Sequence, residues 1–176
     1  MRPGPQLCIF IGVARRYPPR MALVRILVDG YSLLHNWPEL APHGPRHSEA
    51  ARDALIRRLT LYRDAVGTPV TVFFDGAGRR GPAHRPDSEP AVEVVFSRNG
   101  KTADALIERA AHRFAAWGEV LAVTDDLAER DTVTALGGFA SSCQDFIRQV
   151  NAALGEQAED IHHYNRRERH RYHRRR

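Results

Sequence analysis

The chain contains little cysteine and no apolar run long enough to cross a membrane. Its two cysteines in 176 residues, Cys8 and Cys143, form neither a CxxC motif nor the spacing of a zinc site. Their scarcity argues against a disulfide framework and a structural zinc ion, and it favours a reducing, cytoplasmic compartment. The apolar stretch LCIFIGVA near the N-terminus is too short for a bilayer, and the arginines and prolines after it do not resemble a signal-peptide cleavage site.

Negative charge is scarce at both ends of the chain. The formal net charge is +5, but residues 166–176 carry +6 and residues 1–20 carry +4, which leaves −5 on the body between them. We expect one domain over 21–158, an N-terminal extension before it that is disordered, and a basic, disordered tail over 159–176. An acidic body with a basic tail is typical of a cation site on a chain that binds a polyanion.

Short β-branched runs alternate with segments of helical periodicity along the body. Strands are predicted at 23–28, 70–74, 92–96, 120–123 and 139–141. Helices are predicted at 49–66, 102–117, 127–136 and 142–154. The proline-rich segment between the first strand and the first helix is predicted to be a loop, and the charged segment from His162 is not expected to pack. This order predicts an α/β protein with a mostly parallel sheet and helices on both faces.

Acidic residues stand where the apolar runs end. They are Asp29 after RILV, Asp75 after VTVFF, Asp104 after the third run, and the pair Asp125 and Asp126 after VLAVT. The carboxyl ends of parallel strands meet at one edge of a sheet, so these side chains are expected to converge. Converging carboxylates repel one another unless a cation neutralises them, and hard oxygen donors suit Mg²⁺ or Mn²⁺. The pattern predicts a metal site for phosphodiester chemistry.

Each of these acids also has a structural interpretation. Asp29 precedes a glycine and can cap a turn, and Asp104 lies in the first turn of a helix, where the dipole favours a carboxylate. Asp126 and Glu129 have the spacing of a capping box. Asp75 is the weakest candidate ligand because its FDG turn needs no metal.

The motifs taken in order resemble a known family. VDGYS followed by LLH, then FDG, VVFS, GKTADALIE and VTDDLAE ahead of GG and SS, are similar to the YacP-like NYN-domain ribonucleases, relatives of the PIN-domain nucleases, over about residues 23–154. The resemblance implies a three-layer, PIN-like α/β/α fold and a metal-dependent endoribonuclease acting on single-stranded RNA. It suggests mRNA at the ribosome as the substrate, or alternatively the processing of stable RNA. It implies that Asp29, Asp104 and Asp126 are the catalytic acids and metal ligands.

Two residues depart from the family's pattern. Ser32 stands where the pattern has Asn, so a shorter hydroxyl replaces an amide that would orient a carboxylate or a water, and activity is expected to be reduced or tuned. Asp125 stands where the pattern has Ser, and we expect it to add charge as a further metal ligand or to replace a hydroxyl contact.

Three further residues are predicted to assist the site. Thr124 helps to position the acidic cluster, and Lys101 is close enough in sequence to neutralise the scissile phosphate. Glu108 lies one helical turn after Asp104, so it either reaches the metal or a water, or is a surface charge.

Basic residues are expected to bind RNA at two places. The first is the segment after the second strand, with Arg79, Arg80 and Arg85, and the second is the tail, with Arg166, Arg167, Arg169 and Arg171. The alternative for the tail is a merely solvated charge block.

Two other functions compete with a nuclease. A non-catalytic RNA-binding module on the same fold is favoured only by Ser32, since the three acids are present. A phosphatase or phospho-receiver would need DxD or paired acids after the first strand, and the sequence Asp-Gly-Tyr there supplies neither.

Overall fold

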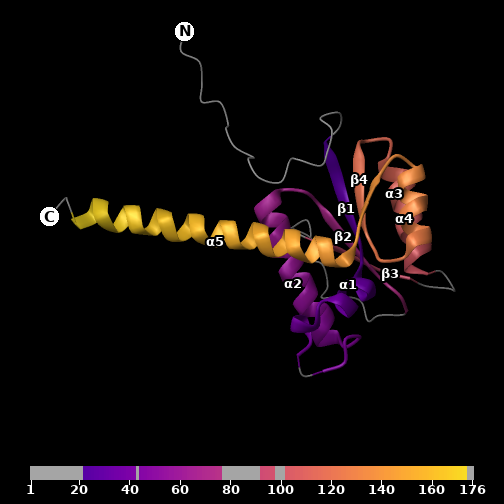
Figure 1. Cartoon of the computed structure of the whole chain (residues 1–176), viewed down its shortest axis with the longest axis horizontal. Coiled ribbons are helices and arrows are strands. Elements are labelled where there is room, and N and C mark those ends of the chain that lie inside the picture. The colour runs from indigo at the N-terminus through magenta and orange to yellow at the C-terminus, as the bar shows by residue number, and fades with distance from the viewer. Residues whose placement is uncertain (1–21, 43, 77–91, 98–101, 174–176) are drawn as a thin grey trace, which may run out of the picture.

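The computed structural model describes residues 22–42, 44–76, 92–97 and 102–173. Within these residues, five strands and six helices follow one another, and Figure 1 shows their arrangement. In order they are β1 (Leu23–Asp29), α1 (Gly30–Asn36), the 3₁₀ helix η2 (Pro38–Leu40), α2 (Glu49–Val66), β2 (Val70–Phe74), β3 (Val92–Phe96), α3 (Ala103–Phe114), β4 (Glu119–Val123), α4 (Leu127–Ala135), β5 (Phe139–Ser141) and α5 (Cys143–His173). The strands match the predicted ones to within a residue.

The five strands form one parallel sheet in the order β3-β2-β1-β4-β5. β1 lies at its centre, with Val28 opposite Val72 of β2 on one side and Val123 of β4 on the other. The chain places β2 and β3 on one side of β1 and then crosses from β3 to β4 on the other side, so the carboxyl end of β1 is the switch point where such sheets bind ligands. The predicted parallel α/β architecture is confirmed.

Side chains of successive β1 residues point to opposite faces of the sheet, and each face has its own core. Ile26 and Val28 belong to the core under α1, α2 and α5, which includes Leu55 and Phe146. Leu27 belongs to the second core, which lies under α3 and α4. Because β1 is buried on both faces, its successive residues are apolar, which explains the continuous apolar run in the sequence. The result is the three-layer α/β/α arrangement seen in Figure 1.

The structure differs from the prediction between β1 and α2, where α1 and η2 replace a loop. The Asp29 side chain caps α1 by accepting from the backbone N–H groups of Tyr31 and Ser32, and α1 buries Leu33 and Leu34 against the core. Seven residues form too short a helix to show the full periodicity that sequence patterns rely on.

The second difference concerns α5, which was predicted to end near Leu154. That prediction is wrong, because α5 continues to His173 and the backbone of the tail up to that residue is helical. No proline interrupts the chain after Pro90, and the tail is rich in residues that tolerate a helix. Ile161 and Tyr164 are exposed, which agrees with the expected lack of packing, and α5 projects beyond the body in Figure 1. Across the described residues, no helix has both the length and the apolarity that a membrane span requires.

Gly30 is needed where β1 passes into α1, because a Cβ there would lie 2.2 Å from the Phe74 ring. That ring cannot move aside easily, since it is fully buried, stacked on Phe96 and in edge contact with Tyr31. We expect Gly30→Ala to lower the free energy of unfolding by about 1–3 kcal/mol, as overpacking does. Urea denaturation measures the change.

Gly155→Ala is the matched control, because Gly155 lies within α5 and a Cβ there meets nothing within 4 Å. It should be neutral or stabilise the protein by up to about 1 kcal/mol. Equal stabilities for the two variants would contradict the close approach of Phe74.

Candidate metal centre

Asp29 ends the central strand, and its carboxylate is held in place by the helix that follows. Oδ1 accepts from the N–H of Tyr31 at 3.1 Å and of Ser32 at 3.2 Å, while the Ser32 hydroxyl donates to Oδ2 at 2.6 Å. Oδ1 of Asp29 therefore caps the turn, as one of the two interpretations of the sequence had it. The Ser32 hydroxyl does orient this carboxylate, as the sequence suggested for that position.

Asp104 projects from the first turn of α3 toward the same edge of the sheet. The N-cap of this helix is Thr102, and the start of α3 is fixed by Asp75, whose Oδ1 accepts from the Ala103 N–H at 2.6 Å and from the Ser97 hydroxyl at 3.2 Å. Asp75 thus has hydrogen bonds that explain it structurally, and it places Asp104.

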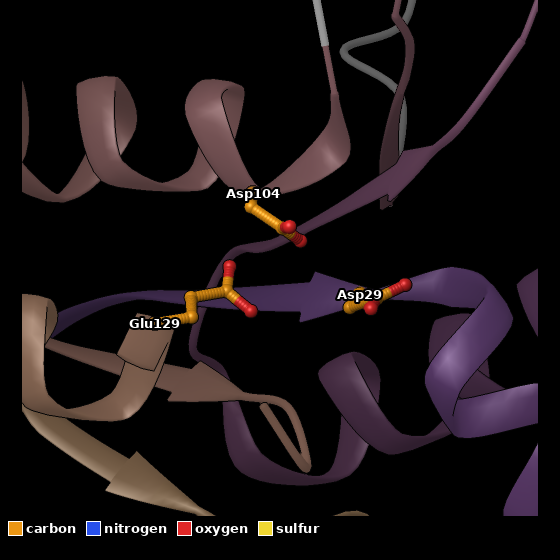
Figure 2. A group of neighbouring side chains, drawn as sticks. All are labelled: Asp29, Asp104 and Glu129. Atoms are coloured by element: carbon orange, nitrogen blue, oxygen red, sulfur yellow. The ribbon is translucent and has the colours of Figure 1, made fainter. Parts of the chain in front are cut away.

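Glu129 is a site residue that sequence reasoning missed. It was interpreted only as the second half of a capping box, and half of that box exists: Asp126 caps α4 through the N–H groups of Ala128 and Glu129 at 2.8 and 3.3 Å. The reciprocal bond does not form, because the Asp126 N–H donates to Thr124 Oγ1 at 3.1 Å. The Glu129 carboxylate is free to turn toward Asp29 and Asp104 (Figure 2).

The carboxylates of Asp29, Asp104 and Glu129 converge from three elements that are distant in sequence. One oxygen of each lies within 4.8 Å of the others. Glu129 is 6% exposed, and neither of its oxygens has a hydrogen-bond partner within the part of the chain that the structure describes. A buried carboxylate with no partner, facing two other carboxylates, fits a divalent cation that prefers oxygen ligands.

The pKa values respond to this crowding. Burial raises the pKa of Glu129 to about 7, and the charges of Asp104, Asp29 and Asp126 act in the same direction, while the nearby Thr124 side chain opposes them. Burial also raises the pKa of Asp104, followed by the charges of Asp29, Asp126 and Asp75. Both directions are those of carboxylates held together without a neutralising charge.

Asp126 and Glu108 lie around this cluster and not within it. Both line an open pocket of about 290 Å³ together with Asp104 and Glu129. The remaining lining residues are Thr102, Ala105, Ala128 and Thr132. Asp126 therefore faces the pocket where it was expected, but one of its oxygens serves the helix cap. Glu108 is exposed on α3.

Asp125 engages different partners. Its oxygens accept from the Asn36 side chain at 2.7 Å and from the Cys143 N–H at 2.9 Å, and it does not belong to the converging group. Thr124 is buried and accepts from the Asp126 N–H, in keeping with a positioning role.

The predicted basic residues fall into two groups. Lys101, Arg79, Arg80 and Arg85 lie outside the described residues, as does the extension over 1–20. The tail arginines at 166, 167, 169 and 171 belong to the helical backbone of α5.

A comparison with known proteins places this geometry in a family. Residues 26–176 match the YacP-like NYN domain. The chain belongs to the YacP-like NYN domain family. It is 30% identical over 126 residues to the uncharacterised protein YacP of Bacillus subtilis (strain 168), covering 71% of this chain and 74% of that protein.

Solved structures agree with this assignment. The crystal structure of a single-residue mutant of Rae1 (YacP) from Bacillus subtilis is similar with a TM-score of 0.66 and 28% identity, over 80% of this chain and 82% of that one. Rae1 without that mutation matches with a TM-score of 0.64 and 27% identity, over 78% and 79% of the two chains. The NYN family has a nuclease-like fold and generally uses divalent metals, so membership supports a nuclease or RNA-related function.

The raised pKa of Glu129 gives a stability prediction. Its folded-state pKa of about 7 exceeds the ordinary 4.5, so the folded protein holds more protons than the unfolded one between these values, and metal-free protein loses stability as the pH rises through this window. We expect Glu129→Gln to stabilise the protein in EDTA by on the order of 2 kcal/mol at pH 8, and hardly at all at pH 4. Urea denaturation at both pH values measures the difference.

Glu108→Gln is the control, because this exposed glutamate lines the same pocket without belonging to the cluster. It should show no such pH-dependent gain. If Glu129→Gln destabilises the protein equally at both pH values, the carboxylate is not an unneutralised buried charge.

Proposed function

We propose that this protein is a divalent-metal-dependent endoribonuclease that hydrolyses single-stranded RNA with Mg²⁺ or Mn²⁺. The observation that supports the proposal is the convergence of Asp29, Asp104 and Glu129 at the carboxyl end of the central strand, with Glu129 buried and without a hydrogen-bond partner among the described residues. Membership of a family with a nuclease-like fold supports the same reaction class.

Asp29, Asp104 and Glu129 would hold the cation, and Asp126 would face it from the pocket rim. A divalent cation held there would lower the pKa of a bound water and would stabilise the negative charge that the phosphate gains during attack. Other hydrogen bonds position these carboxylates. Ser32 fixes the side chain of Asp29, Asp75 fixes the start of α3, and the cap made by Asp126 fixes the start of α4. No Ser, Cys or His nucleophile is required. Asp126 thus keeps the catalytic role expected from the sequence, and Glu129 joins it.

RNA is the partner that the charge distribution favours. The body is acidic where the cation would sit, and the arginines of the tail lie on a helix that extends away from it. A mobile polyanion can then be held by the tail while its backbone reaches the cation. We further propose Lys101 and the arginines at 79, 80 and 85 as phosphate contacts, a ribosomal context for the substrate, and a cytoplasmic location in accord with the free cysteine.

The test of the metal site is RNA cleavage with Mg²⁺ or Mn²⁺, with EDTA, and with substituted acids. Asp104→Asn and Glu129→Gln should each lower the cleavage rate by at least about 100-fold, because each removes charge that holds the cation. Affinity for RNA should remain or rise slightly. The control Glu108→Gln should keep most of the activity, since Glu108 stands outside the cluster.

The alternative, a non-catalytic RNA-binding module, predicts a different result. In that case the parent protein binds single-stranded RNA but releases no product with either metal, and the acid substitutions change nothing. Cleavage by the two substituted proteins at the parent rate would instead show that the assigned acids do not carry the reaction.

The tail is tested by deleting residues 162–176, which removes seven arginines and one glutamate. We expect weaker RNA binding and a smaller dependence of the affinity on salt, by about 0.7 in the logarithmic slope for each arginine that contacts phosphate. Fluorescence anisotropy with labelled single-stranded RNA at several salt concentrations measures both. An unchanged slope would mean that the tail is only solvated.

A further inference from the structure

Asp125 joins two helices that flank the candidate metal centre. Its Oδ1 accepts from the backbone N–H of Cys143, the first residue of α5, at 2.9 Å. Its Oδ2 accepts from the side-chain amide of Asn36, the last residue of α1, at 2.7 Å. Both oxygens of this carboxylate therefore serve protein donors on the α1 and α5 side of the sheet.

Asn36 continues the connection into α1. Its Nδ2 also donates to the carbonyl of Ser32, one helical turn earlier, at 2.9 Å, so this nitrogen uses its two hydrogens on two acceptors. The Ser32 hydroxyl in turn donates to Asp29 Oδ2 at 2.6 Å. Hydrogen bonds thus link the start of α5 to the Ser32 backbone, and the side chain of the same residue bonds to the carboxylate of Asp29.

The connection matters because α1 is too short to be stable without contacts to the rest of the protein. The helix has seven residues. At its C-terminal end the hydrogen bond from the Trp37 N–H to the Leu34 carbonyl is long, at 3.4 Å. A helix this short depends on contacts with the rest of the protein. The Ser32 hydroxyl also has a short reach, so a small shift of α1 would break its bond to Asp29.

We propose that Asp125 and Asn36 form a positioning pair that fixes α1 and, through Ser32, the orientation of the Asp29 carboxylate. Asp125 acts through these contacts and not as a metal ligand. The pair also joins the two departures from the family's pattern, Ser32 and Asp125, because Asn36 bonds to both. The inference rests on the proposed metal function of Asp29.

Asn36→Ala and Asp125→Ala test the pair in the full-length chain. Both variants should bind Mn²⁺ about tenfold more weakly and turn over more slowly by a similar factor, with an unchanged KM for RNA, because partners of a ligand change metal affinity by this amount. The double variant should be little worse than either single one, since both remove the same contact. Titration calorimetry and cleavage kinetics give these values.

Asn151→Ala is the matched control. Asn151 lies on α5 and accepts one side-chain hydrogen bond from Arg58 of α2 at 2.7 Å, so its loss affects the attachment of α5 but not α1. It should leave Mn²⁺ affinity unchanged. The proposal is overturned if all three variants lower the thermal stability and none lowers Mn²⁺ affinity, or if Asp125→Ala abolishes binding as Asp104→Asn does while Asn36→Ala has no effect.

Exchanging the donor and the acceptor tests the contact itself. Asn36→Asp places two carboxylates together. Asp125→Asn leaves one side-chain oxygen for two donors, so either the Asn36 amide or the Cys143 N–H loses its acceptor. Each change alone should therefore weaken Mn²⁺ binding. The combination Asn36→Asp with Asp125→Asn restores a donor facing an acceptor. It should recover part of the affinity, although the bond to the Ser32 carbonyl remains lost. A double variant that binds Mn²⁺ more weakly than both single variants would refute the pairing.

A last measurement does not depend on metal or activity. The N–H groups of Tyr31 and Ser32 donate to Asp29 Oδ1, so their hydrogen exchange reports how firmly α1 is held. In metal-free protein, Asn36→Ala and Asp125→Ala should speed this exchange several-fold, whereas Asn151→Ala should not. If the parent binds no Mn²⁺ while the exchange changes as expected, the proposed metal function fails and the positioning of α1 stands; unchanged exchange refutes the positioning.

Discussion

Repulsion between carboxylates is the constraint on which this site depends. Asp29, Asp104 and Glu129 are brought within 4.8 Å of one another by separate elements, and each would reduce its repulsion by turning away. The protein prevents this by fixing the backbone beneath each one. Asp29 is bonded to the first turn of α1, α3 is fixed by Asp75, and α4 is capped by Asp126.

The acids at this edge of the sheet therefore divide into those that converge and those that hold the others. Both oxygens of Asp125 and Oδ1 of Asp75 accept hydrogen bonds from backbone N–H groups and neutral side chains, which stabilises a carboxylate without any metal. Glu129 is buried and has no such bonds to any residue that the structure describes, which is costly for a charged group. Carboxylates at this edge thus play two different roles. Their hydrogen-bond partners distinguish these roles, whereas the residue type alone does not.

Most of the fold could be predicted from the sequence, because continuous apolar runs and helical periodicity report burial directly. The strands and the order of the layers follow from such patterns. α1 was missed because its seven residues are stabilised by Asp29 and by core contacts, and the end of α5 was missed because composition alone does not stop a helix. Asp29 and Asp104 were found because strand ends and helix starts share one edge. Glu129 satisfies the same rule, in the first turn of α4, but the capping-box spacing gave it another explanation.

That failed explanation shows how the site is built. In a capping box the glutamate would bond to the N–H of Asp126, and its charge would be neutralised locally. Here Thr124 takes that N–H, so Glu129 loses its local partner and faces Asp29 and Asp104 instead. The buried Thr124 hydroxyl thus occupies the N–H that a capping box would give to Glu129. The resulting buried charge lowers the stability of the metal-free protein as the pH rises toward neutrality, and a cation bound by the three carboxylates would restore that stability. Cation binding and the stability of this edge of the sheet would therefore depend on the same carboxylate charges.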